Sequence, residues 1–158
     1  MLYLCSLGSN IDPQQHVPEA VSELVYYFNE VTFSSFIYTQ PRNMASEHVF
    51  VNSLFKFTSS LTRTQIKAFF NQLEIAHGRD RSDPNSSSKD RVLDLDILNI
   101  DASEQCFDIP DYLHTLYQEL TQENPAQAAE YFTFNINNQS PLQLGHRATT
   151  VNRDACSS

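Results

Sequence analysis

Hydrophobic side chains recur with two alternating periods along the first hundred residues, and this order constrains the fold more than any other feature. Short apolar or β-branched runs predict strands at residues 2–7, 31–38, 49–58 and 91–100. Between them, apolar residues spaced three and four apart predict helices over 17–28 and 66–76. We expect Asp12 and Pro13 to start the first helix, Thr62 and Thr64 to open the second, and Gly78 to close it.

The resulting order, β-α-β-β-α-β, is that of a ferredoxin-like α/β sandwich in the α+β class. Two helices would cover one face of an antiparallel sheet and leave the other face open for a ligand. The 158 residues predict a single domain with a core over residues 1–100 and an extension over 101–147. In the extension we expect a helix at 111–121 and a helix running into a strand at 127–134. Residues 8–10 are expected to form a turn, and 148–158 a frayed tail.

Charge and cysteine usage narrow the classes of partner. The net charge of −9 and pI near 4.8 predict repulsion from nucleic acids and from anionic membranes. Three cysteines, at spacings that fit neither a disulfide framework nor a metal pair, predict reduced thiols and a cytoplasmic location. The five histidines are scattered, with no pair at the spacing of a helical metal site, so we expect them to be solvent-exposed or capping residues.

The sequence Asp94-Leu95-Asp96 lies in the last predicted strand of the core. Because side chains alternate along a strand, both carboxylates should share one face, with their Cα atoms roughly 6.5–7 Å apart. Such a pair can bind Mg²⁺ together with substrate phosphate oxygens. It can equally be a solvated strand face.

A cluster of positive charge precedes this pair. Four of the ten basic residues fall within thirteen positions, at Arg79, Arg81, Lys89 and Arg91. Basic side chains beside a metal-binding acid pair suit a nucleoside triphosphate. Alternatively, residues 79–90 form a surface loop whose cations pair with its own aspartates.

Phe50, Asn52 and Leu54 share one face of the strand predicted at 49–58. A flat ring beside an amide suits a planar heterocycle, although a packed sheet residue beside a capping Asn gives the same pattern.

Taken together, five motifs resemble the 6-hydroxymethyl-7,8-dihydropterin pyrophosphokinase family. They occur in order over residues 1–100: L-G-S-N at 7–10, S-S-F-x-x-T-x-P at 34–41, F-x-N at 50–52, E-x-x-x-G-R-x-R at 74–81 and R-x-L-D-L-D-I at 91–97. The resemblance implies a ferredoxin-like fold and transfer of pyrophosphate from ATP, as co-substrate, to the hydroxymethyl group of the dihydropterin, releasing AMP. It also implies small-molecule partners, no nucleic-acid or membrane partner, and a monomer.

The resemblance also assigns roles to individual residues. Asp94 and Asp96 would hold two Mg²⁺ ions, and Asp96 would accept the hydroxyl proton. Catalysis would further use Arg81 and Arg91, which with Arg79 would clamp the ATP phosphates. The pterin would be bound by Asn10, Thr39, Phe50 and Asn52, and the nucleotide also by Asn71, Glu74, Ile97 and Tyr112.

The chain departs from the family pattern in three places. Residues 89–92 read K-D-R-V where the family has G-P-R-T, and residues 38–43 read Y-T-Q-P-R-N where the family has R-x-P-P-L-G. Residues 110–119 have no histidine, arginine or phenylalanine at the positions where the family has them. Two alternatives to an active enzyme therefore stay open. One is a diverged paralogue that binds pterin or nucleotide with weak or altered activity, and the other is an acidic protein-interaction module on the same scaffold.

Overall fold

The computed structural model describes residues 1–39, 49–78, 92–101, 109, 113–122, 125–126, 128, 130–136 and 142–153. The elements run in the order β1 (Leu2–Ser9), α1 (Pro13–Phe28), β2 (Glu30–Phe33), β3 (Ile37–Thr39), β4 (Phe50–Thr58), α2 (Arg63–Ala76), β5 (Asp94–Ile100), α3 (His114–Gln122), β6 (Phe134–Asn135), β7 (Gln143–Leu144) and β8 (Thr149–Asn152). None of the described helices is long and apolar enough to cross a membrane.

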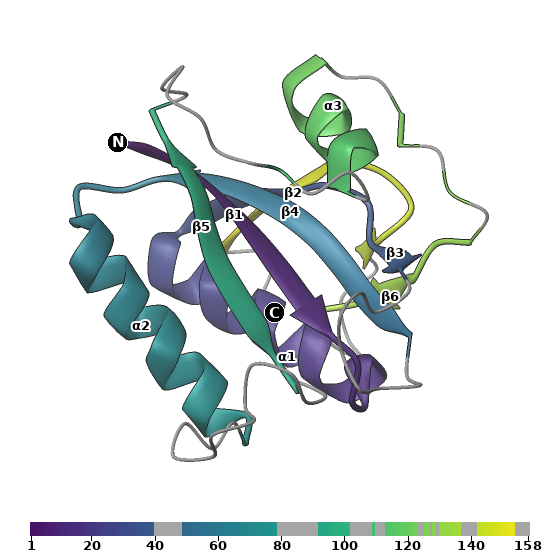
Figure 1. Ribbon diagram of the computed structural model, residues 1–158, viewed down its shortest axis with the longest axis horizontal. Helices are drawn as coiled ribbons and strands as arrows, with labels where there is room; N and C mark the ends of the chain where they lie inside the picture. Colours follow the sequence, from purple (N-terminus) through teal and green to yellow (C-terminus); the bar gives the residue numbers. More distant parts are fainter. Residues whose placement is uncertain are drawn as a thin grey trace.

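The main sheet is antiparallel, with the strand order β5-β1-β4-β2-β8, and β3 pairs with β4 beyond the end of β2 (Figure 1). The helix α1 connects β1 to β2, and β4 lies between these two strands in the sheet. In the same way, α2 connects β4 to β5, and β1 lies between them. This interleaving is the split βαβ arrangement of a ferredoxin-like fold. The predicted fold class is therefore confirmed.

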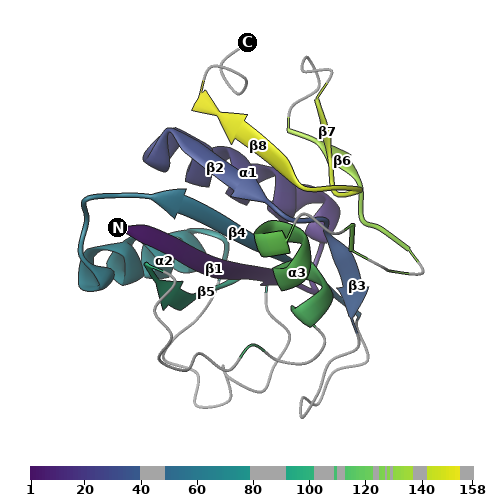
Figure 2. The same ribbon diagram turned by 90° about the horizontal axis from the view of Figure 1, so that it is seen from above.

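The two faces of the sheet pack against different helices. Tyr3, Cys5 and Leu7 of β1 point into a buried core that α1 and α2 share. On the opposite face, Leu54 of β4 packs in a second buried cluster with Leu116 and other residues of α3. The expectation of an uncovered second face is thus wrong in part, because α3 covers the region over β4 (Figures 1 and 2).

The helix ends follow the predictions unevenly. At α2, Thr62 and Gln65 form a capping box, and Gly78 ends the helix with a φ of +109°. At α1, Pro13 occupies the first turn as expected, but Asp12 adopts a left-handed conformation and its side chain makes no capping hydrogen bond. Ala76, expected on the buried face of α2, is exposed.

The strand predicted at 31–38 is confirmed at its two ends, as β2 and β3, but is interrupted at residues 34–36. Phe33 of β2 pairs with Phe55, and Ile37 of β3 pairs with Asn52, so three residues face two on β4. This count is that of a β-bulge. Within the bulge, the backbone N–H of Phe36 donates to the carbonyl of Gly145 at 2.9 Å. Phe36 therefore pairs with a segment near the C-terminus and not with β4.

Three further expectations fail. Gly8 and Ser9, expected in a turn, continue β1 and pair with β4. The described part of 127–134 contains no helix and reaches a strand only at Phe134, in β6. Residues 149–152, expected in a frayed tail, form β8, which pairs along the whole of β2 (Figure 2). The helix expected at 111–121 is confirmed as α3 from His114 onward; residues 111 and 112 lie outside the described residues.

Candidate active site

The two aspartates lie on β5, at one edge of the sheet, and point to the face away from α1 and α2. Leu93 and Leu95, which alternate with them, are buried in the core beneath those helices, whereas Asp94 is half-buried and Asp96 is exposed. The alternation expected of the D-L-D sequence is therefore what the strand adopts. Two carboxylates that share a wall in this way repel each other unless cations lie between them.

Pairing across the sheet aligns Asp94 with other candidate residues. Asp94 pairs with Gly8 of β1, and Gly8 pairs with Asn52 of β4. Since neighbouring strands lie about 4.8 Å apart, the backbones of Asp94 and Asn52 are separated by roughly 10 Å. Between them the row has only Gly8, which has no side chain, so no side chain of this row separates the carboxylate from the amide.

Asn52, Thr39 and Phe50 come together at the other end of this row. The Asn52 side-chain amide donates a hydrogen bond to the Thr39 hydroxyl, and Phe50 pairs with Thr39 across β3 and β4. A Cβ built on Gly8 would lie 2.8 Å from the Asn52 Oδ1 and 3.8 Å from the Phe50 ring. Gly8 therefore gives the amide the space it occupies, a role that the predicted turn did not reveal.

Asn10 follows β1 directly and is 4 % exposed. It lies two residues beyond Gly8, between the end of the strand and the start of α1. Of the four residues expected to bind the pterin, Thr39 thus lies on β3, Phe50 and Asn52 lie on β4, and Asn10 directly follows β1.

Glu74 joins α2 to the strand that carries the aspartates. Its side chain is 1 % exposed, and its Oε2 accepts a hydrogen bond from the backbone N–H of Leu95 at 2.9 Å. Leu95 stands between Asp94 and Asp96 on β5, which is an edge strand of the sheet among the described residues. Glu74 therefore holds the backbone of the D-L-D segment in place, and Asn71 lies one helical turn before it.

Cys5 lies on β1, opposite Ile97 of β5. Burial raises the pKa of the Cys5 thiol well above its usual range, and the negative charge of Asp96 raises it further. A thiol that stays protonated at neutral pH is a poor nucleophile, so Cys5 is a packing residue.

The remaining predicted residues are placed differently. The side chain of Ile97 packs against the core on the α1 and α2 side, away from the aspartates. Arg79, Arg81, Arg91 and Tyr112 lie outside the described residues. The basic cluster at 79–91, expected to bind phosphate, falls there as well.

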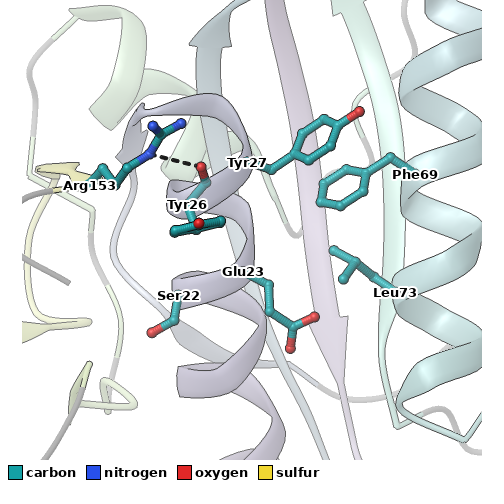
Figure 3. Close-up of a pocket in the computed structure, with 7 residues that line it drawn as sticks. All are labelled: Ser22, Glu23, Tyr26, Tyr27, Phe69, Leu73 and Arg153. Carbon is teal, nitrogen blue, oxygen red and sulfur yellow. Dashed lines mark hydrogen bonds between the residues drawn. The ribbon is translucent and has the colours of Figure 1, made fainter. Parts of the chain in front are cut away.

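A separate groove of about 550 Å³ lies between α1 and α2, on the helical side of the molecule (Figure 3). It contains none of the expected site residues. The rings of Tyr27 and Phe69 stack across it at 3.6 Å, and the Arg153 Nε donates to the Tyr26 carbonyl at 3.0 Å. These contacts tie the two helices and the C-terminal strand together.

Comparison with known proteins identifies the family. A search of curated proteins found no match to the chain. The sequence model of the 7,8-dihydro-6-hydroxymethylpterin-pyrophosphokinase family, however, matches residues 4–134, which is most of the chain and spans β1 to β6. The chain therefore belongs to this family of pterin pyrophosphokinases.

Proposed function

We propose that the protein transfers the pyrophosphoryl group of ATP to 6-hydroxymethyl-7,8-dihydropterin in the presence of Mg²⁺, as a step of folate biosynthesis. The hydroxymethyl oxygen forms a bond to the β-phosphorus of ATP and loses its proton. The bond between the β-phosphorus and the oxygen that bridges it to the α-phosphorus breaks, and AMP leaves. The observation that supports the proposal is the row from Asp94 through Gly8 to Asn52, which aligns a carboxylate and a side-chain amide across three neighbouring strands.

The donor set at the acidic end fits Mg²⁺. Asp94 and Asp96 offer carboxylate oxygens, the ligands that this hard cation prefers, and neither side chain is enclosed in the core. Two Mg²⁺ ions bound there would neutralise charge on the phosphate oxygens and polarise the hydroxymethyl oxygen. Asp96, the more exposed of the pair, would accept the proton that this oxygen releases.

The other end of the row would bind the pterin. Phe50 offers an apolar ring, and the Thr39 hydroxyl fixes the amide of Asn52, which can both donate to and accept from a heterocycle edge. Asn10 would close this end of the site. Held in this way, the ring directs its hydroxymethyl arm toward the aspartates, so that binding energy is used for orientation.

The nucleotide would extend from the acidic end toward α2. Asn71 and Glu74 lie on that helix, and Glu74 also positions β5. Ile97 would contact the nucleotide through its backbone, since its side chain packs in the core. Phosphate-binding roles for Arg79, Arg81 and Arg91, and a nucleotide contact for Tyr112, remain part of the proposal. So do a monomeric state, a cytoplasmic location and the lack of a nucleic-acid or membrane partner.

The test is nucleotide product analysis with the full chain, ATP, Mg²⁺ and 6-hydroxymethyl-7,8-dihydropterin. We expect AMP and no ADP. Asp96→Asn keeps the shape of the side chain but removes its charge, and the loss of several kcal/mol of charge stabilisation should lower AMP formation roughly 1000-fold. The matched control is Glu30→Gln, which neutralises an exposed carboxylate on β2 and should retain the activity of the unaltered protein.

Circular dichroism should be the same for both variants, because neither side chain is buried. ADP as the product would contradict pyrophosphoryl transfer, and an Asp96→Asn variant with full activity would contradict the metal assignment. Binding of pterin or nucleotide without AMP formation would instead support the diverged paralogue.

A further inference from the structure

Two histidines meet on the helical side of the molecule, outside the face that carries the aspartates. His16 lies at the end of the first turn of α1, and His77 follows the last residue of α2. Their Nδ1 atoms are 2.8 Å apart, although the residues are 61 positions apart in the chain. A carboxylate oxygen of Glu19, one turn beyond His16, completes a group of three ligand atoms that all lie within 4.8 Å of one another. His77 is the C-cap residue of α2, so the expectation of exposed or capping histidines holds for it in part. Neither histidine is exposed, however, and the two rings contact each other, which was not expected.

We propose that His16, Glu19 and His77 bind a divalent transition-metal ion of the zinc class. Two imidazole nitrogens and one carboxylate oxygen form a three-ligand set, with a fourth position for water or another ligand. Imidazole suits Zn²⁺ and its neighbours in the first transition row, whereas Mg²⁺ prefers oxygen ligands. This centre would therefore be distinct in chemistry and in place from the proposed Mg²⁺ site.

The environment of His77 supports this assignment. His77 is 8 % exposed, and its Nε2 lies 2.9 Å from the Glu23 Oε1, which accepts a hydrogen bond from it. Because a carboxylate can only accept, this bond engages Nε2, and Nδ1, which faces His16, is the ring atom placed to bind a metal ion. A ligand histidine that donates its other ring N–H to a carboxylate is the usual arrangement around protein-bound metals, because the carboxylate fixes the tautomer and the ring orientation.

The distances require only a small adjustment for metal binding. Two nitrogens that each lie 2.0–2.1 Å from a tetrahedral ion are about 3.3 Å apart. The observed separation of 2.8 Å would have to widen by about 0.5 Å, which the half-buried His16 can supply by a small rotation of its side chain. Glu19 is exposed and can move toward the ion without displacing core residues.

The test is a titration of the full chain, freed of metal by a chelator, with Zn²⁺ in competition with a chromophoric chelator. We expect one equivalent to bind, and Co²⁺ at the same site to give the visible absorption of tetrahedral coordination. His16→Ala removes a ligand at a position that is not fully buried and should abolish competitive binding. Glu23→Gln should weaken binding about 10–100-fold, because the second carboxylate no longer orients His77.

The matched control is His146→Ala, which removes an exposed histidine from another part of the chain and should leave Zn²⁺ affinity unchanged. A large excess of Mg²⁺ should not displace Zn²⁺. No one-equivalent binding, binding that survives His16→Ala, or binding that His146→Ala removes would each overturn the proposal. The readout is metal binding, so the result does not depend on whether AMP is formed.

Discussion

Gly8 shows how a single residue without a side chain shapes the candidate site. We predict that Gly8→Ala displaces the Asn52 amide, because the new Cβ would lie 2.8 Å from its Oδ1. Loss of the Thr39 hydrogen bond and of the amide's contact with substrate should cost about 1–2 kcal/mol, and thus raise the KM for the pterin roughly tenfold. Steady-state kinetics at saturating ATP measure this change.

The control for Gly8→Ala is a double-mutant cycle with Asn52→Ala. In the Asn52→Ala background there is no amide to displace, so adding Gly8→Ala should have little further effect on KM. An equal penalty in both backgrounds would mean that Gly8 acts through the β1 backbone and not through Asn52.

For single residues, the sequence best predicted those features that depend only on residues nearby in the chain. The shared face of Asp94 and Asp96 follows from the two-residue period of a strand, so local sequence is sufficient. The place of Gly8 does not, because glycine is common in turns, and only the pairing of β1 with β4 shows that it lies within the sheet. The family resemblance predicts a nucleotide contact for Glu74, whereas its bond to Leu95 depends on α2 packing beside β5, which local sequence does not encode.

Among the elements, α3 is joined to the bulge between β2 and β3 by hydrogen bonds to one buried carboxylate, that of Glu119. Glu119 is 5 % exposed; its Oε1 accepts from the backbone N–H of Ser35 at 2.5 Å, and its Oε2 accepts from the Ser35 hydroxyl at 2.8 Å. We predict that Glu119→Ala lowers the free energy of unfolding by about 3 kcal/mol, because it leaves buried donors without an acceptor. Urea unfolding followed by circular dichroism measures this loss.

The matched control is Gln118→Ala, at an exposed neighbouring position of α3, which should change the free energy of unfolding by less than about 0.5 kcal/mol. Equal effects of the two substitutions would show that the Glu119 contacts add nothing to stability.

The hydrogen bonds of Glu119 also help to explain why the strand predicted at 31–38 is interrupted. Residues 31–38 have the composition of a continuous strand, and nothing local interrupts it. The interruption comes from partners far along the chain: Glu119 accepts from Ser35, and Gly145 accepts from Phe36. Local periodicity contains no information about such contacts, whereas it did predict α1, α2 and β4.

Over the whole molecule, the sheet is completed by the C-terminal strand. We predict that truncation after Arg147 destabilises the protein, because it removes β8, exposes the edge of β2 and takes Val151, which is 1 % exposed, out of the core. Loss of the buried valine alone should cost about 2 kcal/mol, and the uncovered edge should promote association. Thermal unfolding and size-exclusion chromatography measure the two effects.

The control is truncation after Arg153, which keeps β8 and the bond from the backbone N–H of Arg153 to Asn29 at 2.7 Å. It should unfold at nearly the same temperature as the full chain. If both truncations behave alike, β8 does not contribute to stability.

The contact between the two histidines could not be predicted from the sequence, because it depends on the arrangement of the whole molecule. His16 and His77 meet because α1 and α2 pack side by side on one face of the sheet, and no spacing rule within either helix describes that contact. The order of the core elements was predictable because each element carries its own period. Contacts between elements can be predicted only once the arrangement of the elements in the fold is known.

The row from Asp94 to Asn52 also fixes the distance between the acidic end and the amide end of the proposed site. Its length is set by the distance between hydrogen-bonded backbones, which side-chain substitution leaves unchanged. In the proposed reaction, an alcohol carried on a longer arm would overshoot the acidic end however well its ring was held. Selectivity for the distance between the ring and the alcohol of the substrate would then depend on the backbone spacing. Substitutions at Phe50 and its neighbours could change which flat ring is bound without changing that distance.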